Sequence, residues 1–282
     1  MSRIAYVNGR YLPHAEASVH VEDRGFQFSD GVYEVFAVAH GALIDEELHL
    51  VRLARSLAEL RIARPHSDAV LKHLFREVLR RNRVRNGMLY LLITRGAAPR
   101  DHAFPKDVRP TVVITAKPAR LADPAIAARG VDVVTIPDIR WRRVDIKSVS
   151  LLPNVLGKQH AKEAGAYEAW MVTEACEVTE GTSTNAWIVT KDGALVTRTA
   201  DTSILNGITR LTVLRLAREH DLAIEERSFT LTEAHDAAEA FLTSTTSYVM
   251  PVVRIDGKPV GGGTPGAFTR KLLAEYRGYV AR

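Results

Sequence analysis

Strand-forming segments follow one another in groups along this chain, and the helical patterns do not alternate with them regularly. The expected strands are 4–7, 10–12, 31–38, 42–44, 88–94, 111–116, 131–136, 170–173, 186–190, 194–197 and 240–243. The expected helices are 50–60, 68–86, 153–165, 209–220 and 268–279. A doubly wound parallel sheet would need a regular strand–helix–strand order. The order in this chain therefore predicts an α+β fold.

A change in composition after residue 117 marks an expected domain boundary. A chain of 282 residues is long enough for one large or two modest domains, each with its own core. Between 118 and 124 the sequence passes from strand-forming residues to proline and alanine, which is typical of a linker. We therefore expect a small domain at 1–117 and a larger domain at 125–282.

Short motifs predict local structure within the first domain. Asn8-Gly9 between two apolar segments predicts a β-hairpin with a type I′ turn. Residues 18–21 are expected to add a further strand. In the strand that follows, alternation places Tyr33 and Glu34 on opposite faces, so that the two side chains meet different surroundings.

The formal net charge of +5 has its densest source between Lys72 and Arg85. The same segment carries apolar residues at helical spacing, in a helix that we expect to begin after Ser67 and to end near Asn86-Gly87. The charges then form the solvated face of an amphipathic helix. No series of interleaved aromatic residues offers a surface for base stacking. We therefore expect no nucleic-acid partner.

Cysteine content and hydropathy argue against other classes of protein. Cys176 is the only cysteine, so an intrachain disulfide is excluded, and the ten histidines lack the spacing of metal ligands. The first ten residues lack the apolar core of a signal peptide. The longest apolar runs are far shorter than the roughly 20 residues of a membrane span. We expect a cytoplasmic protein without a metal site or a membrane partner.

Two segments carry side chains that suit carbonyl chemistry. In 140–152, Lys147 lies among apolar residues and small hydroxyl side chains, which remove part of its hydration and favour the neutral amine that attacks carbonyls. In 178–185, Glu180 stands beside a glycine and three hydroxyl side chains. Taken singly, each segment has a plainer alternative, namely a surface lysine on a half-buried strand and a solvated glutamate in a turn.

Together these segments resemble the fold-type IV pyridoxal-phosphate (PLP) enzymes, a family that includes D-amino acid transaminases, branched-chain transaminases and aminodeoxychorismate lyases. The resemblance extends to 23–34, 205–210 and 242–246, so five blocks in the family's order span nearly the whole chain. It implies a small N-terminal α/β domain and a larger C-terminal domain with a distorted barrel, with the cofactor between them.

The resemblance also implies a role for each motif residue toward PLP. Lys147 would form the Schiff base and, once displaced by the substrate amine, would move a proton between the substrate carbon and the cofactor. Glu180 would pair with the pyridine nitrogen and keep it protonated, so that the ring accepts charge from the substrate carbon. An arginine, hydroxyl groups and backbone N–H groups at a helix N-terminus would bind the phosphate. These residues are Arg52, Ile208, Thr209 and Thr245.

The segment 94–105 is similar to the Arg-x-His carboxylate trap of D-amino acid transaminases. In this interpretation Arg100 clamps the substrate carboxylate with two parallel bonds, and His102 and Tyr33 complete its orientation. The run Thr182-Ser183-Thr184 departs from the serine run more usual in that group, although hydroxyls are retained. We predict a homodimer with shared active sites that transfers amino groups between D-amino acids, such as D-alanine, and 2-oxo acids, such as pyruvate and 2-oxoglutarate.

Three alternatives stay open at this point. The enzyme could instead act on branched-chain L-amino acids, or as a lyase on aminodeoxychorismate. A PLP-binding protein without turnover is the third alternative, and the presence of both Lys147 and Glu180 argues against it.

Overall fold

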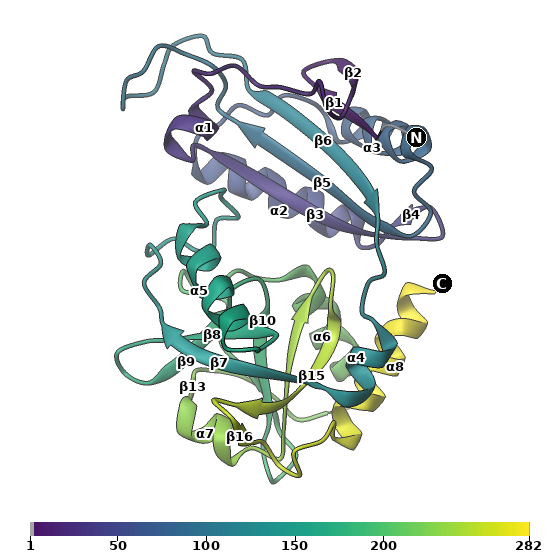
Figure 1. Cartoon of the computed structure of the whole chain (residues 1–282), viewed down its shortest axis with the longest axis vertical. Helices are drawn as coiled ribbons and strands as arrows, with labels where there is room; N and C mark the ends of the chain where they lie inside the picture. Colours follow the sequence, from purple (N-terminus) through teal and green to yellow (C-terminus); the bar gives the residue numbers. More distant parts are fainter. Residues whose placement is uncertain (1–2, 221, 282) are drawn as a thin grey trace. The chain divides into compact units, whose positions relative to one another are not determined.

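The computed structural model describes residues 3–220 and 222–281. By their internal contacts they form two compact units. Unit 1 comprises Met1–Arg120 and Ile146–Ser150, and unit 2 comprises Leu121–Asp145 and Leu151–Arg282. The short segment around Lys147 thus belongs with unit 1, although most of the chain near it belongs with unit 2. Figure 1 traces the helices and strands of the two units along the chain. Both units combine helices with strands, and the predicted α+β class is confirmed.

Unit 1 contains a six-stranded sheet in the order β2-β1-β6-β5-β3-β4, in which every neighbouring pair is antiparallel. Asn8 and Gly9 have φ of 46° and 91°, so the predicted type I′ hairpin is confirmed. The strand expected at 18–21 is wrong: these residues are exposed, and a strand without a face to bury gains little from pairing. The strands are β1 (Ile4–Val7), β2 (Arg10–Pro13), β3 (Gly31–Ala39), β4 (Ala42–Leu43), β5 (Gly87–Thr94) and β6 (Thr111–Pro118).

Where the structure describes unit 1, from residue 3 onward, it contains three helices: α1 (Arg24–Phe28), α2 (Glu46–Glu59) and α3 (Asp68–Asn82). Helix α2 packs on β3, and α3 packs on β1 and β6, which encloses a core built around Phe36 and Phe75. Helix α3 ends four residues before the predicted end, because Arg83 adopts the left-handed conformation. The Asn82 side chain there bonds both the N–H and the carbonyl of Ile4.

The basic residues of α3 are engaged in ion pairs. Lys72 and Arg76 pair with glutamates of α2, and Arg80 and Arg81 both pair with Glu77. Each pair is at least partly exposed, so this face of the helix is solvated and close to locally neutral.

Unit 2 contains a ten-stranded sheet whose path runs β12-β11-β10-β14-β15-β7-β8-β9-β13, with β16 paired to β15. Strands β9 and β10 are joined by only Thr182–Thr184, yet four strands lie between them along the sheet path. Such a short link requires the sheet to curl until its distant strands meet, which gives a distorted barrel. The strands are β7 (Val131–Pro137), β8 (Glu168–Val172), β9 (Glu177–Gly181), β10 (Asn185–Val189), β11 (Leu195–Thr197), β12 (Ile224–Glu226), β13 (Phe229–Thr230), β14 (Glu239–Ser244), β15 (Tyr248–Ile255) and β16 (Lys258–Pro259).

The described residues of unit 2 form five helices, and the buried rings of Trp187 and Phe241, stacked at 5.4 Å between β10 and β14, mark its core. Helix α6 packs on α8 and β14, and α5 packs on β7 and β8. No helix in the described part of the chain is long and apolar enough to cross a membrane. The helices are α4 (Pro124–Arg129), α5 (Leu152–Glu163), α6 (Ile208–Glu219), α7 (Leu231–Asp236) and α8 (Ala267–Val280).

Candidate active site

The backbone around Lys147 is bonded to two elements of unit 1. The Tyr33 N–H donates to the Lys147 carbonyl at 3.0 Å, and the Val149 N–H donates to the Gly31 carbonyl at 3.0 Å. The Lys147 N–H donates to Oγ of Ser56, on α2, at 3.3 Å. Bonds to both β3 and α2 fix the position from which the lysine side chain extends.

The side chain of Lys147 reaches the ring of Tyr33. Its Nζ lies 4.2 Å from the ring centroid, within the range of a cation–π contact. Tyr33 in turn stacks on Tyr90 of β5, with 5.5 Å between the ring centroids. Burial raises the pKa of Tyr90 to about 12, so this phenol stays neutral at physiological pH. Two of the residues predicted for the site are therefore brought together.

Arg52, predicted to bind phosphate, forms a buried cluster with two residues that the sequence analysis did not assign. Its Nε and Nη2 donate to the two carboxylate oxygens of Glu34 at 2.8 and 2.7 Å, and Nδ1 of His49 lies 2.7 Å from the same carboxylate. Burial alone would raise the pKa of Glu34, but the ion pair and hydrogen bonds with Arg52 and His49 hold it at about 2. The helical spacing of His49 and Arg52 is the signal that could have linked them.

The Glu34 carboxylate fixes the plane of the Arg52 guanidinium through two parallel bonds. Burial is the main cause that lowers the pKa of His49, and the positive charges of Arg52 and Lys147 add to it. A neutral His49 leaves the arginine as the cation of this cluster.

Arg100 and His102 lie on the loop between β5 and β6. The guanidinium carbon of Arg100 is 4.6 Å from the centroid of the Phe28 ring, and the ring of His102 is 5.3 Å from the same centroid. Both residues therefore meet one aromatic side chain of α1.

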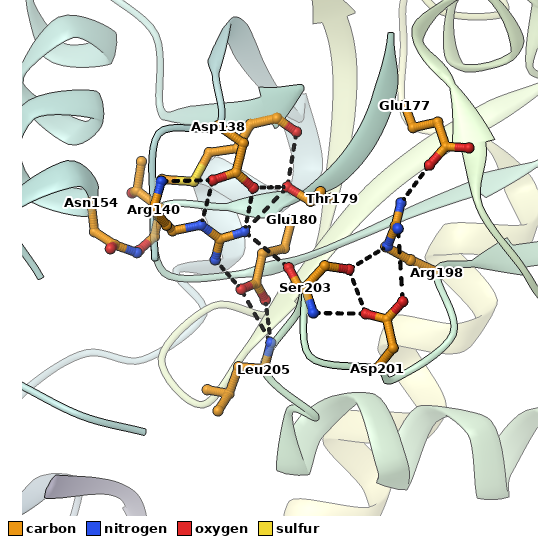
Figure 2. Close-up of polar contacts among 12 residues, drawn as sticks. Asp138, Arg140, Asn154, Glu177, Thr179, Glu180, Arg198, Asp201, Ser203 and Leu205 are labelled. Atoms are coloured by element: carbon orange, nitrogen blue, oxygen red, sulfur yellow. Dashed lines mark hydrogen bonds and ion pairs between the residues drawn. The ribbon is translucent and has the colours of Figure 1, made fainter. Parts of the chain in front are cut away.

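Glu180 is the candidate acidic residue of unit 2, and it lies within β9 with 5 % of its surface exposed. Its carboxylate accepts from the Leu205 N–H at 3.1 Å through both oxygens (Figure 2). It also accepts from Nδ2 of Asn185 at 3.0 Å. The alternative of a solvated glutamate in a turn is wrong, because Glu180 is a buried residue of a strand in the curled sheet.

Arg140 is the functional candidate that the sequence analysis missed in unit 2. Its guanidinium pairs with Glu180 through Nη1 and with both oxygens of Asp138, at 2.9 and 2.7 Å, through Nε and Nη2. Burial by itself would lower the pKa of Arg140, but the two carboxylates outweigh that effect and raise it. Figure 2 shows this guanidinium between the two acidic side chains. The Arg140-Trp-Arg-Arg run contains no signal that selects this arginine.

The N-cap residue of α6 is Gly207, which has no side chain with which to cap the first N–H groups of the helix. Ile208 and Thr209 are the first two residues of this helix, and both are buried. A Cβ on the preceding Gly207 would lie 2.1 Å from Oδ1 of Asn185, so any other residue there would displace the Asn185 amide. The predicted Thr245 lies in the turn between β14 and β15 and is half-buried.

Comparison with known proteins identifies the family. Residues 31–255 match the model for amino-transferase class IV. The chain belongs to this family. The aminotransferase is 43 % identical over 265 residues to a D-alanine aminotransferase of Bacillus licheniformis, covering 94 % of this chain and 93 % of that one. It is 38 % identical to the D-alanine aminotransferase of Staphylococcus haemolyticus, covering 98 % and 97 % of the two chains.

Solved structures agree with this assignment. A branched-chain amino acid aminotransferase with pyridoxamine 5′-phosphate superposes with a TM-score of 0.91 at 26 % identity, covering all of this chain and 96 % of that one. The branched-chain aminotransferase of the archaeon Thermoproteus uzoniensis, with norvaline, superposes with a TM-score of 0.88 at 27 % identity, covering 100 % and 95 % of the two chains. The predicted membership of the PLP-dependent aminotransferases, with their fold, is thereby confirmed.

The donor set of the aminotransferase fits pyridoxal 5′-phosphate. Unit 1 supplies a primary amine at Lys147, and unit 2 supplies a buried carboxylate at Glu180 and a helix N-terminus without a side-chain cap at Ile208. These are the kinds of group that bind an aldehyde, a pyridine nitrogen and a phosphate.

Proposed function

We propose that this aminotransferase transfers amino groups between D-amino acids of the D-alanine type and 2-oxo acids such as pyruvate and 2-oxoglutarate. The observation that carries the proposal is the amine of Lys147 held 4.2 Å from the centroid of the Tyr33 ring. A base and a hydrogen-bonding phenol are thus available to one substrate, the first at its α-carbon and the second at its carboxylate. The D-alanine aminotransferases at 37–43 % identity support the choice of substrate class.

Lys147 is the base of this reaction. When bound, PLP supplies an aldehyde that condenses with amines and a protonated ring that accepts electrons. The neutral amine of Lys147 removes the proton from the α-carbon of the substrate and later returns a proton, which makes it both general base and general acid. Its backbone bonds to Tyr33 and Ser56 keep the amine in reach for both steps.

Glu180 holds the proton on the pyridine nitrogen. A carboxylate can do so only while it remains ionised, and Arg140 provides the adjacent positive charge. The Leu205 N–H and the Asn185 amide donate to the same carboxylate and fix its orientation. Arg140 and its partners are therefore positioning residues that act through Glu180.

The phosphate is bound by four residues that offer different kinds of donor. Ile208 and Thr209 contribute N–H groups at the positive end of the α6 dipole. Thr209 and Thr245 add hydroxyl groups, and Arg52 adds a guanidinium whose plane is set by Glu34.

The substrate carboxylate is bound by Arg100, His102 and Tyr33. A guanidinium offers two parallel bonds to a carboxylate, and the two further donors define which way the α-carbon faces. We propose that the enzyme is a homodimer in which the loop carrying Arg100 and His102 serves the active site of the partner subunit.

Amino-donor specificity tests the proposal. The purified, PLP-loaded enzyme is given D-alanine or L-leucine separately, each with 2-oxoglutarate, and the glutamate formed is resolved by chiral chromatography. We expect rapid formation of D-glutamate from D-alanine and little product from L-leucine. Preference for L-leucine with L-glutamate as product would favour the branched-chain alternative, and release of pyruvate from aminodeoxychorismate would favour the lyase.

A further inference from the structure

The side chain of Arg24 holds the loop that carries Arg100 and His102. It is 3 % exposed, and it donates from Nη1 to the carbonyl of Asp101 at 2.5 Å and from Nη2 to the carbonyl of His102 at 3.3 Å. Its Nε donates to Oδ2 of Asp30 at 2.8 Å. One guanidinium thus joins the middle of the loop to a carboxylate beside β3.

Arg24 also shares an aromatic neighbour with both loop residues. Its guanidinium carbon lies 4.8 Å from the centroid of the Phe28 ring, and that of Arg100 lies 4.6 Å from it. The ring of His102 is 5.3 Å from Phe28. Arg24 and Phe28 are separated by one helical turn in α1, so they project from the same face of that helix. Arg24 therefore acts on His102 through its backbone carbonyl, and it shares the Phe28 ring with both Arg100 and His102.

Asp30 connects Arg24 to a second arginine that holds another part of the loop. Nε and Nη2 of Arg95 donate to the Asp30 carboxylate at 2.7 and 3.0 Å. The guanidinium of Arg95 lies 3.7 Å from the ring centroid of Phe104, two residues beyond His102. Burial would raise the pKa of Asp30, but the two arginines outweigh that effect and lower it.

The base of the loop is anchored to α1 as well. The Arg24 N–H donates to the Gly96 carbonyl at 2.9 Å, and the Thr94 hydroxyl donates to the Asp23 carboxylate at 2.9 Å. A Cβ on Gly25 would lie 2.2 Å from a methyl of Thr94, so the helix and the end of β5 are in close contact. The loop is therefore bonded to α1 at its base, and the Arg24 side chain adds bonds further along it, at Asp101 and His102.

We propose that Arg24, supported by Asp30, is a positioning residue that sets the conformation of the substrate-carboxylate loop and thereby the affinity for the amino-acid substrate. The proposal rests on the proposed function, because it assigns Arg100 and His102 to the carboxylate. In this proposal Arg24 affects KM through its bonds to the loop rather than through a bond to the substrate. The guanidinium is needed because a single group must reach two carbonyls and a carboxylate at once.

Replacement of Arg24 by glutamine tests the proposal. We expect R24Q to raise KM for D-alanine by about tenfold, in line with the loss of a charge-assisted hydrogen bond, and to leave kcat within about threefold. The visible absorption of bound PLP should not change. R76Q is the matched control, since Arg76 is an ion-paired arginine of unit 1 that lies on α3, away from this loop, and its KM should equal that of the wild type.

A double-mutant cycle separates positioning from a general structural role. If Arg24 acts through the carboxylate-binding loop, adding R24Q to R100A should raise KM by much less than R24Q alone does. Independent, multiplicative effects on KM would overturn the proposal, and so would an unchanged KM in R24Q.

Amide hydrogen exchange of residues 100–104 gives a readout that does not need turnover. We expect faster amide exchange there in R24Q than in R76Q, with α3 unchanged in both; equal exchange in the loop would overturn the proposal. If R24Q fails to fold, R24K keeps the charge beside Asp30 without the reach to both carbonyls, and the same measurements on R24K decide. A wild-type enzyme inactive toward D-alanine would instead refute the proposed function, while the exchange result would still report on the loop.

Discussion

Nζ of Lys147 lies 4.2 Å from the centroid of the Tyr33 ring, although the two residues come from distant parts of the chain. The contact depends on backbone pairing, since the Tyr33 N–H donates to the Lys147 carbonyl at 3.0 Å. A short segment, Ile146–Ser150, is thereby built into unit 1 while the chain on both sides of it belongs to unit 2. The position of the candidate base is thus set by the same strand that supplies the candidate carboxylate-binding phenol.

Replacement of Lys147 by alanine should abolish transamination. The amine that bonds PLP and moves the proton is lost, while the phosphate-binding residues remain. We expect the visible absorption of lysine-bound cofactor to disappear and turnover to fall to background. Absorption spectra and the D-alanine assay measure this, with K117A as control because Lys117 is an exposed lysine of β6. Undiminished activity in K147A would show that Lys147 is not the base of the reaction.

Replacement of Glu180 by glutamine should leave PLP bound and slow the chemistry. The neutral amide cannot hold a proton on the ring nitrogen by ion pairing, so electron withdrawal weakens. We expect the single-turnover rate of α-proton removal, followed with α-deuterated D-alanine, to fall by about a hundredfold or more. A rate within about threefold of the wild type corresponds to a change in barrier height of less than about 1 kcal/mol. Such a rate would mean that another group protonates the ring.

The buried Glu34 carboxylate should make unit 1 sensitive to acid. Its pKa of about 2 in the folded state lies below its ordinary value of 4.5, so its stabilising contribution is fully present above pH 4.5 and is lost as the pH falls through about 2. The difference corresponds to roughly 3 kcal/mol of unfolding free energy. Urea denaturation of wild type and E34Q measures it: the gap between their midpoints should narrow progressively below about pH 4. A gap that stays constant over that range would contradict the assignment.

Subunit mixing tests whether Arg100 and His102 act in the partner's active site. R100A should raise KM for D-alanine with a smaller effect on PLP binding, because a carboxylate clamp contributes mainly to binding and orientation. When R100A and K147A proteins exchange subunits, a loop that acts on the partner leaves one site of each heterodimer with both groups intact, so activity should reappear. If activity stays at the level of the separate variants, with the heterodimer verified by mass spectrometry, the loop serves its own subunit.

The sequence by itself determined the features that depend on neighbouring residues. The Asn8-Gly9 turn forms as predicted, because positive φ at both positions is a local preference that these residues meet. Ser67 caps α3 as predicted, because its side chain accepts a hydrogen bond from the nearby Val70 N–H. Five motif blocks in order identified the family, since the chemistry of the cofactor constrains residue types at fixed places along the chain.

Only the tertiary structure decided how distant residues meet. No strand was predicted at 177–181, yet Glu180 lies in the buried strand β9, because the short link to β10 forces the sheet to curl around it. Arg140 could not be chosen from three arginines in one run, since its role comes from Asp138 and Glu180 on either side of it in space. The bond from Arg24 to His102 could not be predicted, because every residue has a backbone carbonyl and the sequence does not indicate which one accepts. Local conformation depends on adjacent side chains and can be predicted from them. Burial and charge pairing depend on which distant segments the folded chain brings together.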